Sequence, residues 1–298
     1  MRQDEPRFRT GTVAIVGRPN VGKSTLVNRA VGAHVAATSS KAQTTRHRIQ
    51  GILTEARTQF IFVDTPGYQT TYASALNRVM NRTVGQVVEE VDAVVLVIDA
   101  AGWDARDEAV LKLVPPTARA ILALNKVDRL KDKGPLARVL LESAKKRDFA
   151  SLVPISATKG TQVRALLAEI RKLLPEQPPI YSADDITDRP ERFLAAELVR
   201  ERIFRLLGDE LPYAIAVVID GFAAEGRLRR ISATIYVDRP GHKAIVIGQK
   251  GATLKRIGTE ARHAMEELFG SRVHLELWVK VKRGWADNEL TLHQWGYT

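Results

Sequence analysis

The chain has 298 residues, of which 45% are hydrophobic, so it is long enough to form two domains that each bury a core. Cysteine is absent from the sequence, which excludes disulfides, thiolate zinc sites and cysteine nucleophiles and is typical of a reducing compartment. The formal net charge of +11 favours an anionic partner such as nucleic acid or a membrane surface. Residues 1–180 contain 27 Lys and Arg against 17 Asp and Glu, whereas residues 181–298 contain 18 against 17, so charge alone does not locate that partner's site.

The first part of the sequence alternates between two kinds of pattern. Short aliphatic and β-branched runs predict strands that are covered on both faces, at Val13–Gly17, Gln59–Asp64, Ala93–Asp99, Ala120–Asn125 and Leu152–Ser156. Helical patterns fall between these runs, for instance at Leu136–Lys146 and Val163–Leu173. This alternation predicts a doubly wound α/β domain, in which ligands bind beyond the carboxyl ends of the strands.

The segment Gly17–Thr25 has the G-x-x-x-x-G-K-[ST] spacing of a phosphate-binding loop between a strand and a helix. Its glycines leave room for backbone N–H groups to point at a phosphate chain, and the following helix directs its positive end at the anion. We expect Lys23 to reach the β- and γ-phosphates and the Ser24 hydroxyl to hold Mg²⁺. The other nucleotide-binding candidates in this loop are Gly17, Asn20, Val21, Gly22 and Thr25.

The tetrapeptide Asp64–Gly67 directly follows a hydrophobic strand. The Asp64 carboxylate can hold Mg²⁺, mostly through water, and the Gly67 N–H can bond a γ-phosphate until hydrolysis removes it. A threonine hydroxyl from the polar loop upstream can complete the Mg²⁺ shell only when the γ-phosphate is present. We favour Thr45 for this role, with Thr44 as the alternative. The candidate catalytic residues are therefore Lys23, Thr45, Asp64 and Gly67.

Polar residues suited to guanine follow the last two predicted strands of this part. Asp128 can accept hydrogen bonds from the N1–H and the 2-amino group of guanine, an edge that adenine lacks. Asn125 can brace the loop, and Lys126 can cover the base. The candidates for bonding guanine O6 through a backbone N–H are Ser156, Ala157 and Thr158. Each motif alone is explained equally well by a turn, but their order and placement at strand ends together predict a GTP site.

Three prolines between Pro175 and Pro179 predict a stiff linker, and the sequence pattern changes beyond it. The second part predicts a smaller α+β domain of the order α-β-β-α-α-β, from patterns at Glu191–Leu207, Tyr213–Asp220, Arg230–Asp238, Lys243–Gly248, Ala252–Phe269 and Val273–Val281. The expected organisation is an N-terminal tail (1–10), a nucleotide-binding domain (11–176), a linker (177–189), a second domain (190–285) and a C-terminal tail (286–298).

The tetrapeptide Gly248–Gly251 lies between the two predicted helices at Lys243–Gly248 and Ala252–Phe269. In KH modules a G-x-x-G loop at this place clamps a backbone stretch of about four nucleotides. The two glycines would let phosphates approach, while Gln249 and Lys250 would contact them. A plain helix–helix turn is the alternative explanation of these four residues taken alone. Local positive charge would come from Lys243, Lys255 and Arg256.

The nucleotide-binding segments look like the five boxes of a small GTPase, and the sequence resembles the Era family of bacterial GTPases over nearly its whole length. Beyond residue 180 the resemblance is carried by Thr187–Glu197, Val246–Gly251 and His274–Lys282. It implies a P-loop GTPase domain followed by a type-II KH domain that binds RNA. It further implies GTP and GDP as ligands, binding to the 3′ end of 16S rRNA and to the 30S ribosomal subunit, and a role in the late assembly of that subunit.

The residue after Gly67 departs from the pattern of Ras-type enzymes, in which a glutamine there orients the attacking water. A tyrosine at position 68 cannot do so, and we expect slow intrinsic hydrolysis. In related phosphate loops an asparagine at the place of Asn20 helps to bind K⁺ against the β- and γ-phosphates. Activation by K⁺ is therefore a hypothesis that the resemblance suggests.

The leading interpretation is a GTP-hydrolysing switch whose nucleotide state changes how tightly RNA is held. A second hypothesis is an RNA-binding assembly factor whose nucleotide site is only structural, and a third is a membrane-bound GTPase that uses its basic surface. No apolar run approaches the ~20 residues that a membrane span needs, so we expect a cytoplasmic protein. We also expect a monomer. The resemblance also implies a weak peripheral contact at the inner face of the cell membrane. Trp278 and Trp285 are expected to lie in the core or in an interface rather than to stack on bases, since an alternating strand pattern already explains Trp278.

Overall fold

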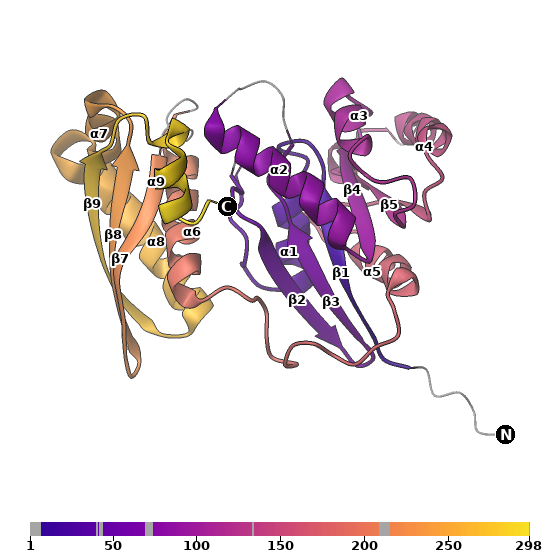
Figure 1. Ribbon diagram of the computed structural model, residues 1–298, viewed down its shortest axis with the longest axis horizontal. Helices are drawn as coiled ribbons and strands as arrows, with labels where there is room; N and C mark the ends of the chain where they lie inside the picture. The colour runs from indigo at the N-terminus through magenta and orange to yellow at the C-terminus, as the bar shows by residue number, and fades with distance from the viewer. Residues whose placement is uncertain are drawn as a thin grey trace. The chain divides into compact units, whose positions relative to one another are not determined.

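The computed structural model describes residues 7–39, 41, 44–68, 74–132, 134–208 and 215–297 (Figure 1). The chain divides into two compact units. Unit 1 comprises Met1–Ala36, Thr45–Tyr72 and Met80–Asp188, and unit 2 comprises Ala37–Thr44, Ala73–Val79 and Arg189–Thr298. The loop before Thr45 therefore belongs to unit 2, although the sequence surrounding it folds into unit 1.

Unit 1 is built on a six-stranded sheet of the order β2-β3-β1-β4-β5-β6. Its strands are β1 (Arg9–Val16), β2 (Ile49–Glu55), β3 (Thr58–Asp64), β4 (Ala93–Asp99), β5 (Ala120–Asn125) and β6 (Ser151–Pro154). β2 runs antiparallel to β3, and the other neighbouring strands are parallel. The parallel pairing brings the carboxyl ends of β1, β3, β5 and β6 to one edge of the sheet, where every predicted nucleotide-binding segment begins.

Helices cover both faces of this sheet, as the alternation of side chains along β1 requires (Figure 1). Val13 and Ile15 pack against α1 and α5, whereas Ala14 and Val16 share a second core with α2, α3 and α4. The helices are α1 (Lys23–Val31), α2 (Ala75–Glu90), α3 (Ala105–Leu111), α4 (Gly134–Lys146) and α5 (Val163–Leu173). The predicted doubly wound fold is confirmed.

The predicted linker contains residues that are fastened to the edge of the unit 1 sheet. The Gln59 side chain accepts hydrogen bonds from the N–H groups of Ile180 and Tyr181, at 2.8 and 2.9 Å. Ile52 in β2 donates its N–H to Ile186 O at 2.9 Å. Much of the segment after the prolines is thus hydrogen-bonded along β2 and β3.

Unit 2 contains a three-stranded sheet of the order β7-β8-β9, in which β7 is antiparallel and β9 parallel to β8. Its elements follow the predicted order and are α6 (Glu191–Leu206), β7 (Ile215–Glu225), β8 (Leu228–Val237), α7 (Pro240–Ile247), α8 (Ala252–Phe269) and β9 (Arg272–Val281). Ile257, Ala261 and Met265 on one face of α8 are buried in a core with α6 and the sheet. A short helix that the sequence did not predict, α9 (Glu289–Gln294), follows the sheet.

Trp278 does not lie in the core, and its expected place in an interface stays a prediction. Along β9 the even-numbered positions face away from α8, so Trp278 keeps 47% of its surface exposed, while Leu275 and Leu277 on the other face point at the helix. Trp285, by contrast, is buried at 1% exposure and lies in a cluster with Trp295 and Tyr297.

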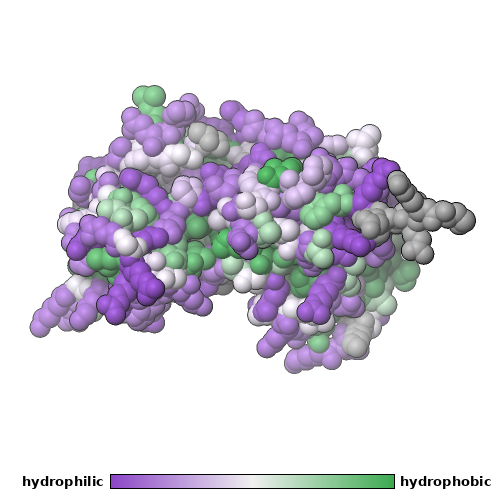
Figure 2. All heavy atoms as spheres, turned by 90° about the horizontal axis from the view of Figure 1, so that it is seen from below, coloured by the Kyte–Doolittle hydropathy of each residue, from purple (hydrophilic) through white to green (hydrophobic). Residues whose placement is uncertain are grey.

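Some segments singled out in the sequence lie outside the described residues, namely 1–6 of the predicted N-terminal tail, 40, 42 and 43 of the loop before Thr45, 213–214 of a predicted strand, and 298 of the C-terminal tail. Within the part of the chain that is described, no helix combines the length and the apolar composition that a membrane crossing requires. Hydrophilic side chains predominate on the face shown in Figure 2, with hydrophobic ones between them.

Candidate nucleotide site and nucleic-acid groove

The loop between β1 and α1 has a backbone shape that its glycines make possible. Gly17 and Gly22 have φ values of 156° and 100°, in the region that side chains rarely adopt. A Cβ on Gly17 would lie 2.4 Å from Val97 O, and one on Gly22 would lie 2.3 Å from Asn125 Nδ2. Both positions therefore exclude any side chain, for reasons of conformation and of space.

The side chain of Arg18 anchors this loop to α3. Its Nε lies 3.1 and 3.2 Å from the two carboxylate oxygens of Asp107, whose side chain is fully buried. The same carboxylate accepts the N–H of Asp104 at 3.0 Å, in the capping box that begins α3. Sequence reasoning missed this ion pair, since the partners are separated by 89 positions without a shared motif.

Lys23 lies in the hollow of the loop. Its Nζ donates to Gly17 O and Arg18 O, each at 3.0 Å, and the residue is only 6% exposed. Burial lowers the pKa of this ammonium from 10.5 to about 8, against the opposing effect of the Asp64 carboxylate. An incoming phosphate would supply the negative charge that this buried ammonium lacks.

Ser24, Thr45 and Asp64 come together although they are far apart in the sequence. Asp64 Oδ2 lies 2.7 Å from Ser24 Oγ and 3.2 Å from Thr45 Oγ1, and the two hydroxyl oxygens are 2.7 Å apart. Burial raises the pKa of the Asp64 carboxyl to about 6. Of the two threonine candidates, Thr45 is the one bonded to Asp64, whereas the Thr44 hydroxyl donates to Lys41 O at 2.7 Å.

Gly67 lies against the phosphate-binding loop. A Cβ on Gly67 would come within 2.8 Å of Pro19 Cα, so only glycine allows this approach. The next residue, Tyr68, is partly buried and packs against the core on the side of α2, α3 and α4. Its side chain therefore contributes to packing.

Asn125 links two loops at the end of the site where the nucleobase is expected. Its Nδ2 donates to Val21 O at 2.7 Å, and its Oδ1 accepts the Ala157 N–H at 2.9 Å. Lys126 has a left-handed backbone and pairs with Asp99 at 2.8 Å. Asp128 lies in a short 3₁₀ turn, Val127–Arg129, with its side chain exposed. The residues expected to select the base thus extend from a loop that Asn125 fastens to the phosphate-binding loop.

Arg29 of α1 holds the segment Ser156–Thr158 in place. Ser156 is buried and its hydroxyl accepts the Lys159 N–H at 3.1 Å. Arg29 donates to Ala157 O at 3.1 Å and to Thr158 O at 2.5 Å. Arg29 was not predicted, and no local sequence signal marks it, because its partners lie more than 120 positions away.

The G-x-x-G loop of unit 2 presents two polar side chains to solvent. Gly248 and Gly251 have φ values of 71° and 81°, and Lys250 between them has φ 49°. A Cβ on Gly248 would lie 2.1 Å from Thr253 Oγ1, so this position requires glycine. Gln249 and Lys250 are exposed, as contact with phosphates requires.

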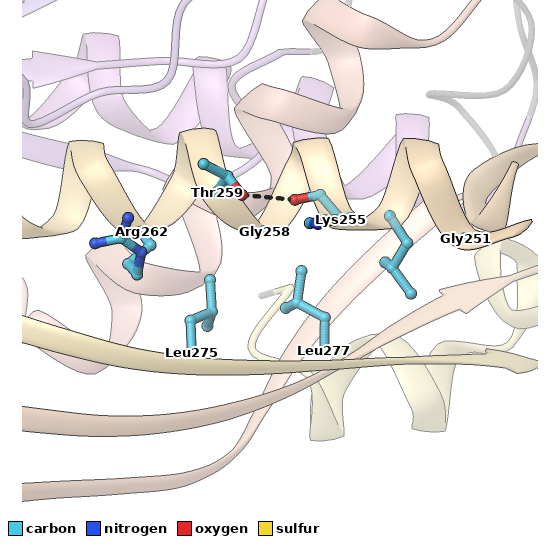
Figure 3. A pocket seen from close by; sticks show the side chains of 8 residues that line it. Gly251, Lys255, Gly258, Thr259, Arg262, Leu275 and Leu277 are labelled. Carbon is cyan, nitrogen blue, oxygen red and sulfur yellow. Dashed lines mark hydrogen bonds between the residues drawn. The ribbon is translucent and has the colours of Figure 1, made fainter.

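A groove of about 430 Å³ runs between α8 and β9 from Gly251 onward (Figure 3). Leu275 and Leu277 point from β9 toward α8 and form an apolar floor, and Arg262 and Lys255 supply positive charge. The remaining residues that line it are Gly251, Leu254, Gly258 and Thr259. An apolar floor with basic side chains suits nucleobases whose phosphates lie at the rim.

Only part of this groove was predicted. Gly251 and Lys255 line it, whereas Lys243 and Arg256 are not among its lining residues, and Arg256 pairs with Glu260 at 2.9 Å. The residues that were missed repeat at helical intervals after Gly251 and at alternate positions of β9, namely Leu254, Gly258, Thr259, Arg262, Leu275 and Leu277. This double periodicity is a signal that could have found them.

Two family models match the chain. Residues 12–126 match the model described as 50S ribosome-binding GTPase, and residues 210–286 match the KH domain. The two matches fall on the halves of the chain that carry the phosphate-binding loop and the G-x-x-G loop, respectively.

Similar proteins cover almost the whole chain. GTPase Era from Nitrosomonas eutropha is 51% identical over 97% of this chain and 98% of its own length. GTPase Era from Bordetella pertussis is 49% identical over 98% of this chain and 99% of its own.

Two solved structures are similar to this chain at a TM-score of 0.94 and 39% identity, each over 98% of it. One is a tyrosine-to-alanine variant of Aquifex aeolicus Era bound to GDP and AlF₄⁻, of which 100% is covered. The other is Era in complex with MgGDPNP and nucleotides 1506–1542 of 16S ribosomal RNA, of which 99% is covered.

Proposed function

The chain belongs to the Era family of GTPases, and we propose that it binds 16S rRNA near its 3′ end and acts as a GTP-dependent switch in assembly of the 30S ribosomal subunit. The observation that carries the nucleotide part is the cluster of Ser24, Thr45 and Asp64 beside the buried Lys23. Membership of a family of GTPases speaks against the alternative of a nucleotide site that is only structural.

The residues of this cluster fit a magnesium ion. Asp64 Oδ1 is buried and has no hydrogen-bond partner within the described part of the chain, so one carboxylate oxygen remains available to a ligand. The two hydroxyls and the carboxylate form an all-oxygen donor set, which Mg²⁺ prefers. We propose that Ser24 and Thr45 hold Mg²⁺ directly and that Asp64 holds it mainly through water. The ion would neutralise charge on the β- and γ-phosphates.

The protein's own groups then position and neutralise the triphosphate. Lys23 would move from the carbonyls of Gly17 and Arg18 to the β- and γ-phosphates, whose charge favours its protonated form. Gly67, which touches Pro19, would donate its N–H to the γ-phosphate. Loss of that phosphate would remove the acceptor of the Gly67 N–H, and Thr45 would hold the ion only while the phosphate is present, so both segments would be released together.

We propose that intrinsic hydrolysis is slow and that K⁺ accelerates it. Tyr68 is engaged in packing, and Asn20 stands exposed on the phosphate-binding loop with φ 65°. A monovalent cation beside Asn20 would supply charge against the β- and γ-phosphates. Single-turnover hydrolysis measured in K⁺ and in Na⁺ buffers tests this proposal, and equal rates in the two would reject it.

The groove between α8 and β9 is the proposed site for RNA. Gln249 and Lys250 would contact the backbone at the G-x-x-G loop, and bases would lie on Leu275 and Leu277. The double substitution Gln249→Asp/Lys250→Asp should abolish binding of the 16S rRNA segment 1506–1542 and leave basal GTP hydrolysis unchanged. Loss of both activities would show that the two sites are not separate in function.

We also propose the domain limits expected from the sequence, with GTPase residues 11–176, linker residues 177–189 and KH residues 190–285, and a monomer located in the cytoplasm. A weak peripheral contact with the inner face of the cell membrane is the remaining part of the proposal, based on the net charge of +11. Co-sedimentation with anionic vesicles at low and at moderate salt tests it: binding that weakens as the salt rises supports a contact by surface charge, and no binding at low salt rejects it.

A further inference from the structure

A second groove continues from the first at the other end of α8. It is open, has a volume of about 1030 Å³ and lies between the end of α8 and the beginnings of β8 and β9. Arg262 lines both grooves, so they share a wall. Together they extend along the whole of α8, which at ~1.5 Å per residue is roughly 27 Å long.

The basic side chains that line this second groove outnumber the acidic ones. Its two carboxylates are already bonded, since Glu225 pairs with Arg230 at 3.0 Å and Glu266 pairs with Arg262 at 2.7 Å. Glu266 also accepts the Val273 N–H at 3.1 Å. Arg227 and Arg272 line the groove as well, and neither has a carboxylate partner among the described residues. The groove therefore offers two guanidinium groups for an anion.

The backbone holds these two arginines side by side. Arg272 donates its N–H to Arg227 O at 3.0 Å, where the parallel pairing of β8 and β9 begins. Gly270 also lines the groove, and a Cβ placed there would meet no atom within 4 Å. The surface at Gly270, beside the two arginines, is thus open.

We propose that Arg227 and Arg272 bind phosphates of a single-stranded RNA that continues past Arg262, beyond the nucleotides held at the G-x-x-G loop. This inference rests on the proposed RNA-binding function and extends its site. The carboxyl end of a helix repels anions, and α8 ends at Phe269, so the helix itself does not favour a phosphate here. Binding at this end depends on the two guanidinium groups, which form charge-assisted bonds to phosphate oxygens.

The test compares RNAs of two lengths from the 16S rRNA 3′ end, a tetranucleotide and one of about twelve nucleotides, which is within the range of a single-strand site. The variant Arg227→Gln/Arg272→Gln should bind the tetranucleotide as the native protein does. Its affinity for the longer RNA should fall roughly three- to thirtyfold, the range that two exposed charge pairs supply. The slope of log K against log salt for the longer RNA should decrease by about 1.4, or ~0.7 for each phosphate contact.

A charge-matched control is Arg239→Gln/Arg283→Gln, which removes the same charge from two exposed residues that line neither groove. The control should keep the native affinity and salt slope for both RNAs. If the two double variants behave alike, or if Arg227→Gln/Arg272→Gln retains the native salt slope, the inference is overturned. Failure of the native protein to bind either RNA would instead refute the proposed RNA function, so the two failures are distinguishable.

Discussion

Thr38 donates two hydrogen bonds to one carboxylate oxygen of Glu201, its N–H at 3.0 Å and its hydroxyl at 2.8 Å from Oε1. Arg205 adds bonds to Thr38 O at 3.1 Å and to the Thr38 hydroxyl at 2.7 Å. The Glu201 side chain is completely buried on α6. Thr38 and α6 both belong to unit 2. The anchored residue precedes Thr45 by seven positions, so α6 holds one end of the segment that delivers the proposed metal ligand.

We predict that Thr38→Val lowers the rate of GTP hydrolysis several-fold and leaves GDP affinity unchanged. Valine keeps the branched shape but loses the hydroxyl, and with it two of the four bonds between Thr38 and α6. The proposed role of Thr45 exists only while the γ-phosphate is present, so a looser segment should affect hydrolysis alone. Single-turnover hydrolysis and GDP titration measure the two effects. Thr38→Ser retains the hydroxyl and should behave as the native protein, and a native rate for Thr38→Val would refute the anchoring role.

A second prediction concerns the stability of the protein without Mg²⁺ and nucleotide. Burial raises the pKa of Asp64 from 3.8 to about 6, so the folded state binds this proton more tightly than the unfolded chain does. The contribution of this carboxyl to the free energy of unfolding is present in full below about pH 4 and is lost as the pH rises through 6. The loss amounts to at most about 3 kcal/mol, at 1.36 kcal/mol per pKa unit.

Asp64→Asn places an uncharged group of the same size at this position and does not titrate. In EDTA the variant should therefore be more stable than the native protein at pH 7–8, and the difference should shrink toward zero near pH 4. Urea unfolding at several pH values measures it. The addition of Mg²⁺ and GTP should reverse the order, because the native carboxylate then has a cation partner. A difference that does not vary with pH would contradict the prediction.

Most of the nucleotide site could be predicted because its parts are local in sequence. The spacing within Gly17–Thr25 fixes a strand, a turn and a helix start, and the hydrophobic strand before Asp64 locates its carboxylate at a sheet edge. Parallel pairing of β1 with β3 then brings Ser24 and Asp64 together, whereas Thr45 reaches them from the loop before β2, which pairs antiparallel with β3.

The parts that could not be predicted depend on partners that are distant in sequence. No spacing rule connects Arg18 with Asp107 or Arg29 with Ala157, because only the folded sheet brings them together. β2 was missed since, as an edge strand with Gly51 in it, it lacks the continuous apolar run of a central strand. The extent of the unit 2 groove requires knowing which face of β9 lies against α8, and the same knowledge decides that Trp278 lies outside the core.

A third prediction concerns the choice of base. Asp128 is exposed, and no structural partner of its carboxylate is found in the described chain, so guanine can take both of its oxygens. Asp128→Asn should weaken GTP binding roughly 100-fold or more, because hydrogen bonds to a carboxylate contribute ~1.5–3 kcal/mol each. Xanthosine triphosphate, which has a carbonyl in place of the 2-amino group, should bind the variant better than GTP does. Calorimetry with both nucleotides measures this change of preference. Native GTP affinity in the variant would exclude Asp128 from base selection.

The fourth prediction separates stability from RNA binding at Gly258, which lies within α8 and lines the groove. A Cβ there would meet Leu277 at 3.5 Å, an ordinary contact, so Gly258→Ala should stabilise the protein by about 0.5–1 kcal/mol, the usual gain over glycine inside a helix. Gly258→Leu should fill the space above Leu277 and lower RNA affinity about tenfold or more, as the loss of one stacked base does. GTP hydrolysis should stay unchanged in both variants. Urea midpoints and RNA titrations measure the two effects, and native RNA affinity in Gly258→Leu would mean that bases do not enter this groove.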